Sequence, residues 1–131
     1  MAVGDLDGDT IPDLVTANSF SDDVSVLRGN GDGTFQAAVA FAVGDAPRSV
    51  AVADLDGDNV PDLLTTNQNS DDVSVLLGHG DGTFQTAAAF RVGNNPFHAA
   101  VADLDGDAFP DLVTANILDN DVSVLLNRAS R

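Results

Sequence analysis

The stretch Asp5-Leu6-Asp7-Gly8-Asp9 determines how the rest of this sequence is interpreted, because it returns twice without change. It recurs at residues 54–58 and again at 103–107, so successive copies begin 49 residues apart. Residues 5–53 and 54–102 are identical at 33 of 49 positions, and their alignment needs no gap. A third copy begins at Asp103 and breaks off after Leu126. Self-similarity at a fixed period of this length is the signature of a repeat architecture.

Each copy divides into four short segments that turn residues separate. In the second copy, the most complete one, the segments are 49–53, 62–66, 72–77 and 87–93. They are rich in Val, Leu, Ala and Thr and are bounded by Gly, Asp and Asn, and none has a helical period. The repeated Asn18, Asn67 and Asn116 follow the second segments, and we expect them to cap strand ends through bonds to the backbone. The sequence therefore predicts an all-β protein.

Four strands in a unit of about 50 residues are typical of a β-propeller blade. We predict blades of four antiparallel strands, about three per chain, within one partial propeller over residues 1–131. The expected blades are about 1–44, 45–93 and 94–131, the last without its outermost strand, since no third Gly-Asp-Gly-Thr-Phe turn follows Leu126. Small residues in the first segment of a blade suit the crowded centre of a propeller, as at Ala51, Ala53, Ala100 and Ala102. A β-solenoid is the alternative, although its rungs are usually shorter.

The charge of the chain excludes several functions. The sequence has 21 acidic residues, all Asp, and five basic residues, all Arg, which gives a formal net charge of −16. Nucleic-acid binding needs a basic face, and an anionic membrane surface would repel this chain. No apolar run approaches the roughly 20 residues that span a bilayer, so membrane insertion is not expected. Cysteine is absent, which excludes disulfides and thiolate ligands, and His79 and His98 are isolated.

The aspartates of the repeated loop recur at positions 1, 3, 5 and 9, counted from its first residue. Four carboxylates in one tight turn repel each other unless a cation lies among them. Oxygen ligands, with a backbone carbonyl at position 7, suit Ca²⁺ better than Mg²⁺. The alternative is an ordinary Asx-turn loop without any metal. The candidate ligands are Asp5, Asp7, Asp9, Ile11 and Asp13; Asp54, Asp56, Asp58, Val60 and Asp62; and Asp103, Asp105, Asp107, Phe109 and Asp111.

Three motifs together resemble the FG-GAP/VCBS repeats, extracellular bacterial repeats related to the propeller of integrin α subunits. They are Asp-Leu-Asp-Gly-Asp-x-x-Pro-Asp-Leu, the later Gly-Asp-Gly-Thr-Phe, and Phe-x-Val-Gly-x-x-Pro at residues 41–47 and 90–96. The resemblance implies one Ca²⁺ in the loop between the first two strands of each blade, up to three per chain. It also implies an extracellular, secreted or cell-surface module for binding or adhesion, although residues 1–5 do not have the pattern of a signal peptide.

Position 6 of the loops departs from the glycine that is frequent in the family. Here it holds Thr10, Asn59 and Ala108, at a point where a positive φ is expected. Asparagine tolerates the left-handed region, whereas threonine and alanine are strained there. We therefore expect the second loop to bind Ca²⁺ most tightly.

The copies differ most after the repeated Asn and before the first strand. Both variable segments should lie on the rim opposite the aspartate loops, where they could contact an extracellular protein or a glycan. The alternative is that these loop sequences differ because nothing constrains them. The absence of Trp and Tyr weakens a sugar-binding interpretation. No acid, base or nucleophile stands apart from the repeat, so we do not expect an enzyme. The candidate rim residues are Phe20, Arg48, Phe97, His98, Ile117 and Leu118.

Three blades do not close a ring, because the two end blades would leave apolar faces in water. We expect a homodimer that closes a six-bladed ring, or else the remaining blades of a longer parent chain. Two further interpretations stay open: a purely structural or self-assembling element without ligand, and a non-catalytic accessory propeller of a secreted enzyme.

Overall fold

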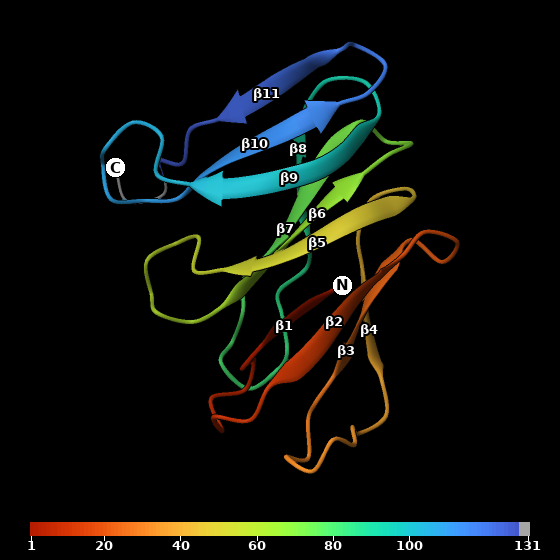
Figure 1. Ribbon diagram of the computed structural model, residues 1–131, viewed down its shortest axis with the longest axis vertical. Helices are drawn as coiled ribbons and strands as arrows, with labels where there is room; N and C mark the ends of the chain where they lie inside the picture. The colour runs from red at the N-terminus through yellow and green to blue at the C-terminus, as the bar shows by residue number, and fades with distance from the viewer. Residues whose placement is uncertain (129–131) are drawn as a thin grey trace.

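Three antiparallel sheets make up the computed structural model, which describes residues 1–128 and contains no helix in that range (Figure 1). The all-β prediction is therefore confirmed. The first sheet consists of β1 (Ala2–Gly4), β2 (Asp13–Asn18), β3 (Asp23–Leu27) and β4 (Val39–Ala42). The second consists of β5 (Pro47–Ala53), β6 (Asp62–Asn67), β7 (Asp72–Leu76) and β8 (Ala88–Arg91). The third consists of β9 (Pro96–Ala102), β10 (Asp111–Asn116) and β11 (Asp121–Leu125).

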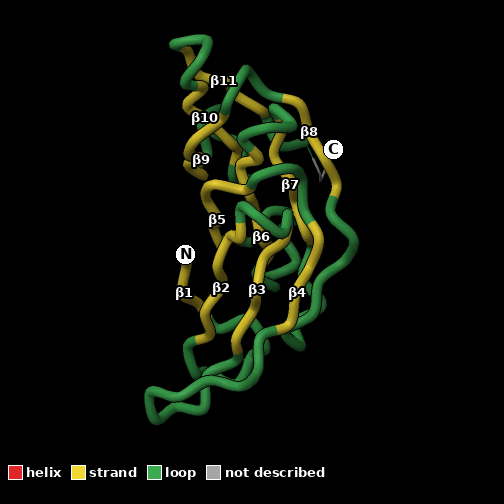
Figure 2. The backbone as a smooth tube through the Cα atoms, turned by 90° about the vertical axis from the view of Figure 1, so that its right-hand side faces the viewer, coloured by secondary structure: helices red, strands yellow, loops and turns green. Residues whose placement is uncertain are grey.

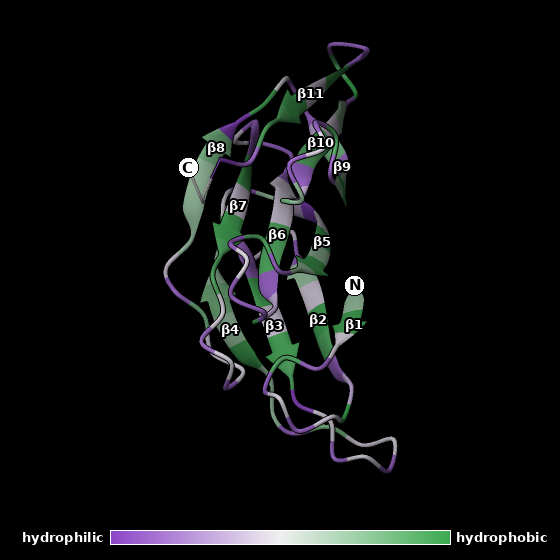
Figure 3. Ribbon diagram, turned by 90° about the vertical axis from the view of Figure 1, so that its left-hand side faces the viewer, coloured by the Kyte–Doolittle hydropathy of each residue, from purple (hydrophilic) through white to green (hydrophobic). Residues whose placement is uncertain are grey.

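Within each sheet the strands lie side by side in chain order. Figure 2 shows the first strands, β1, β5 and β9, along one side of the molecule, and β4 and β8 along the other. In Figure 3 the strands show green apolar segments between pale and purple polar ones, and much of the loops is pale or purple. The second sheet lies between the other two, and every residue of its strand β6 is buried. This position explains why the strands have apolar residues on both faces.

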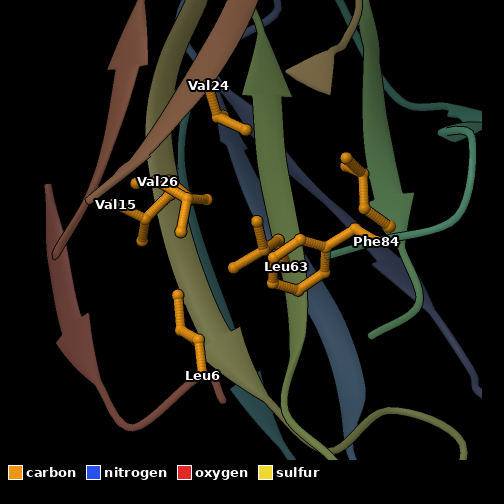
Figure 4. Close-up of a cluster of buried hydrophobic side chains, with 8 residues drawn as sticks. Leu6, Val15, Val24, Val26, Leu63 and Phe84 are labelled. Atoms are coloured by element: carbon orange, nitrogen blue, oxygen red, sulfur yellow. The ribbon is translucent and has the colours of Figure 1, made fainter. Parts of the chain in front are cut away.

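Two apolar layers hold the sheets together. Between the first and second sheets, Val15, Val24 and Val26 meet Leu63 and the ring of Phe84 (Figure 4). Phe84 is 8% exposed, and its ring contacts that of Phe41 edge to face, with 5.3 Å between the centroids. The layer between the second and third sheets consists of Leu55, Leu64, Val73, Ala99 and Leu112. Leu63 and Leu64 thus serve opposite layers, as the alternation of side chains along a strand requires.

The repeated asparagines have partners other than the expected backbone groups. Asn67 is fully buried, and its Nδ2 donates to Asp72 Oδ1 at 2.7 Å and to Ser74 Oγ at 2.9 Å, while its Oδ1 accepts from Thr65 Oγ1 at 2.8 Å. Asn18 and Asn116 have the corresponding partners. These side-chain networks satisfy buried polar atoms that would otherwise destabilise each sheet.

The same network joins neighbouring sheets. The hydroxyl of Ser74 accepts a hydrogen bond from Gly44 N at 3.1 Å, and Ser123 accepts one from Gly93 N at 3.0 Å. A Cβ on Gly44 would lie 2.5 Å from Nδ2 of Asn67, so only glycine fits at this approach. The glycine of the Phe-x-Val-Gly motif is therefore a point of contact between one repeat and the next.

Candidate metal sites

Each aspartate loop joins the first strand of a sheet to the second. The three loops are residues 5–12, 54–61 and 103–110, and they follow β1, β5 and β9. In Figure 1 these three loops lie on the same side of the molecule, at the left. The repeat therefore places its most acidic segments along one rim.

The aspartate at position 9 of each loop holds the loop closed through hydrogen bonds to the backbone. Asp13 is fully buried, and its Oδ2 accepts a hydrogen bond from Leu6 N and its Oδ1 one from Gly29 N, both at 2.8 Å. Asp62 and Asp111 accept the corresponding pairs at 2.7 and 2.8 Å. Each of these carboxylates thus joins the start of its loop to the second residue after the third strand of its sheet. Charge-assisted bonds of this kind are about twice as strong as neutral ones.

The aspartates at positions 1, 3 and 5 curl the loop through bonds to its own backbone. Asp5 accepts from Gly8 N and Thr10 N, both at 2.8 Å, and Asp9 accepts from Ile11 N at 2.8 Å. The second and third loops repeat these bonds, with Val60 N and Phe109 N in the place of Ile11 N. These are the Asx-type turns of the alternative interpretation. Since a carboxylate oxygen has two lone pairs, these bonds do not exhaust its capacity as an acceptor or ligand.

Carboxylate oxygens converge in all three loops. In each of three groups, one oxygen from each of three aspartates lies within 4.8 Å of the others. The groups differ in membership, so the structure does not bring the four aspartates of a loop together identically. Asp9, Asp62 and Asp107 lie outside them. The groups are Asp5, Asp7 and Asp13; Asp54, Asp56 and Asp58; and Asp103, Asp105 and Asp111.

The acidic clusters carry charge that few cations offset. Burial raises the pKa of Asp7 and that of Asp56, and neighbouring carboxylates raise both further. Burial also raises the pKa of Asp62, against the opposing N–H bonds from Gly78 and Leu55. The hydrogen bond from Thr10 N–H lowers the pKa of Asp5. Within residues 1–128, the single ion pair joins Arg28 Nε to Asp7 Oδ2 at 4.0 Å.

Neighbouring sheets contact the first two loops. The Gly82 N–H, from the Gly-Asp-Gly turn of the second sheet, donates to Leu6 O at 3.1 Å. Arg28 Nη2 donates to Asp81 O in the same turn at 2.5 Å. The ring of Phe109 lies over the second loop, 2.9 Å from where a Cβ on Gly57 would be. Sequence reasoning missed Arg28, although it stands where the other copies have Leu77 and Leu126, and that difference was a usable signal.

Position 6 has the left-handed backbone that the sequence predicts. The φ angles are 71° at Thr10, 65° at Asn59 and 73° at Ala108. The expected positive φ is therefore confirmed in all three loops. Threonine and alanine are strained in this conformation, which costs roughly 1–2 kcal/mol for a residue other than Gly, Asn or Asp.

The rim candidates lie at the other end of the strands. Pro47 pairs with Asn67 at one end of the β5–β6 ladder, whereas Ala53 pairs with Asp62 at the end next to the aspartate loop. The structure brings two candidates together, because the guanidinium of Arg48 lies 4.9 Å from the centroid of the Phe97 ring. The other four are exposed: Phe20, His98, Ile117 and Leu118.

Fold and loops together define a class of protein: an all-β repeat protein in which each sheet has an acidic loop between its first two strands. Comparison with protein families identifies it further. The model of the FG-GAP-like repeat matches residues 5–65 and 61–114, and the chain belongs to this family. A search of curated proteins finds no match. Among the described residues, no helix is long and apolar enough to cross a membrane.

The strain at position 6 predicts that glycine stabilises two loops and not the third. Thr10→Gly and Ala108→Gly should each raise the free energy of unfolding by about 0.5–1 kcal/mol, because relief of strain exceeds the entropy that glycine adds to the unfolded chain. Asn59→Gly is the matched control, with a change near zero. Urea unfolding of the three variants measures the differences. A Thr10→Gly variant less stable than the parent chain would contradict the argument.

Proposed function

We propose that the chain is a non-catalytic, calcium-binding β-propeller module in which each sheet is one blade. The single observation that carries the calcium proposal is the convergence of three carboxylates in each of three loops. Ca²⁺ prefers oxygen ligands and accepts irregular geometry, so the donor set fits it. When bound, the cation would supply positive charge to clusters whose carboxylates form, within residues 1–128, one ion pair, that of Asp7 with Arg28.

The propeller proposal rests on how the sheets are arranged. Their first strands follow one side of the molecule, as the strands around a central channel do, and alanine recurs in β5 and β9. The strands of each sheet then run outward in chain order. Propellers consist of four-stranded sheets arranged in this way around an axis.

The calcium sites are proposed to be structural and unequal. Up to three ions would bind, one per loop, with the three converging aspartates as the principal ligands and the remaining aspartate of each loop nearby. Asn59 adopts its positive φ at less cost than Thr10 or Ala108. The second loop should therefore bind Ca²⁺ most tightly. Outside cells, where Ca²⁺ is abundant, all three sites would contribute, which supports an extracellular, secreted or cell-surface location.

Calcium titration tests this proposal. Calorimetry should show up to three sites of unequal affinity, and a site at 100 times its Kd adds about 2.7 kcal/mol to the free energy of unfolding. EGTA should therefore lower the Tm. Asp54→Asn should remove the tightest site. Asp45→Asn is the matched control, since it removes the same charge at the opposite rim and Asn94 already occupies the equivalent position. A Tm that EGTA leaves unchanged would contradict the calcium proposal. Three equal affinities would contradict the ranking of the loops.

The two end sheets support a head-to-tail partner. On the first sheet Val3 is 62% and Phe35 39% exposed, and on the third Val122 and Val124 are 63% and 53% exposed. In the layer between the first and second sheets, the corresponding residues pack together: Val52 and Phe84, one repeat after Val3 and Phe35, and Val24 and Val26, two repeats before Val122 and Val124. The two exposed faces are thus the two halves of an interface that the chain already contains. We propose that a second copy completes it in a six-bladed ring, or that flanking blades do so in a longer parent chain.

Sedimentation measures this association. The chain should sediment as a dimer of 13.4 kDa protomers. Phe35→Asp should shift it to monomer, because it places a charge in the proposed apolar interface. Phe20→Asp is the control, because Phe20 is an exposed phenylalanine at the rim, outside the proposed interface. It should leave the dimer unchanged. A monomer at all concentrations would leave the flanking-blade alternative in its place.

The opposite rim is the surface that we propose for an extracellular protein or glycan ligand. The contact between Arg48 and Phe97 is the observation that favours it, because it holds a cation and an aromatic ring together at an exposed position. The double variant Arg48→Ala, Phe97→Ala should lose binding to an array of such ligands and keep its calcium affinity. If the parent chain binds nothing on the array, a purely structural element or an accessory propeller of a secreted enzyme is the better proposal.

A further inference from the structure

Asn30 differs from the other nine asparagines of the chain because glycine follows it. An asparagine side chain can react with the backbone nitrogen of the next residue, and a side chain on that next residue obstructs the approach. Glycine has no Cβ to obstruct it, and its backbone rotates freely. The sequence therefore singles out Asn30 as the most reactive asparagine, provided that its surroundings leave it accessible.

The turn that contains Asn30 exposes it to solvent. Asn30 is exposed, and so are residues 31–40. Gly31 has a φ of 84°, and within residues 1–128 no group accepts a hydrogen bond from its N–H. His79 occupies the equivalent position in the second turn and is exposed too, although the loop of the first sheet contacts that turn. Exposure at this position is therefore a property of the turn, which a neighbouring sheet does not remove.

A short chain of exposed hydrogen bonds holds the Asn30 amide. Its Nδ2 donates to Thr34 Oγ1 at 2.9 Å, and Thr34 Oγ1 donates to Asp32 Oδ1 at 2.5 Å. Water competes with exposed bonds of this kind, so each contributes little. Asn67, by contrast, is fully buried and has three side-chain partners. The Asn30 amide can therefore leave its partner at lower cost than a buried asparagine can.

We propose that Asn30 is a site of spontaneous deamidation, a covalent modification for which water is the only co-reactant. The Gly31 nitrogen loses its proton to solvent and attacks Cγ of Asn30, which forms a five-membered succinimide ring. The bond between Cγ and Nδ2 breaks, and Nδ2 takes up a proton and leaves as ammonia. Water then opens the ring at either carbonyl, which gives aspartate or isoaspartate at position 30. No atom is oxidised or reduced.

Deamidation places a new carboxylate beside the first aspartate loop. Thr34 Oγ1 has one proton, which it donates to Asp32, so a carboxylate at position 30 would find an acceptor there in place of a donor. The preceding residue, Gly29, donates its N–H to Asp13 Oδ1 at 2.8 Å. The modified residue thus adjoins the bond that closes the first loop, and its added charge weakens that turn.

Peptide mapping by mass spectrometry tests the proposal. The tryptic peptide of residues 29–48 contains Asn30 and no other asparagine. When the folded chain is incubated at mildly alkaline pH, this peptide should gain the mass of an amide-to-acid exchange. The gain should be at least about tenfold faster than at any other asparagine, and chromatography should resolve two products of equal mass. The rate should rise with pH, because the attacking nitrogen must lose its proton. EGTA can be present throughout, since the reaction does not rest on the proposed calcium sites.

Two variants locate the reaction. Asn30→His gives the first turn the residue that the second turn has at this position, so the chain should fold and its 29–48 peptide should keep its mass. Asn69→His is the matched control, because Asn69 is also exposed but serine follows it, and the parent rate should remain. A 29–48 peptide that gains no mass in the parent chain, or that still gains it in Asn30→His, would overturn the proposal.

Asn30→Asp reproduces one product and measures its effect on the fold. It should lower the Tm by about 2–4 °C, because the turn loses a hydrogen-bond donor and gains a charge. Asn120→Asp is the matched control, since it adds the same charge at an exposed position where the other copies have Asp22 and Asp71. It should leave the Tm unchanged. Equal melting of Asn30→Asp and the parent chain would overturn the inferred weakening of the turn.

Discussion

Each sheet depends on one buried carboxylate that accepts two backbone hydrogen bonds. Asp13, Asp62 and Asp111 each join the start of an aspartate loop to the segment after the third strand. A buried charge is tolerated only when its partners satisfy it, and here both partners belong to the backbone that it orders. Because this clamp fixes where the loop begins and ends, the shorter Asx turns within the loop bring the other carboxylates together.

The sequence presented Asx turns and a metal site as alternative interpretations of the loops. Asx turns are present, and Asp5, which accepts two of their bonds, also belongs to a converging group, so the turns are compatible with the proposed metal site. Burial, and after it the neighbouring carboxylates, raise the pKa of Asp7 and that of Asp56, which is the electrostatic cost of this arrangement. In the first loop the positive charge of Arg28 offsets part of this cost through its ion pair with Asp7. The other two copies have leucine at the position of Arg28. Near-identical loop sequences thus experience different surroundings, because the sheets that flank them differ.

The period of 49 residues and the motifs at fixed offsets were sufficient to predict the strands, the family and the positive φ at position 6, since these follow from local chemistry. What the sequence did not predict depends on packing between repeats. Three such features are visible only in the folded chain. They are the choice of the three aspartates that converge in each loop, the contact between Arg48 and Phe97, and the side-chain partners of Asn67.

The bond from Gly44 N to Ser74 Oγ, and its counterpart from Gly93 to Ser123, have a consequence for how the molecule melts. A linear array of repeats ordinarily frays from its ends, each unit detaching by itself. Here, detachment of one repeat removes one of the two donors of a serine hydroxyl in the next, the other being Asn67 for Ser74 and Asn116 for Ser123. Neighbouring repeats are thus coupled by a polar hydrogen bond as well as by their apolar contacts. This coupling favours concerted unfolding of all three sheets over unfolding of one sheet at a time.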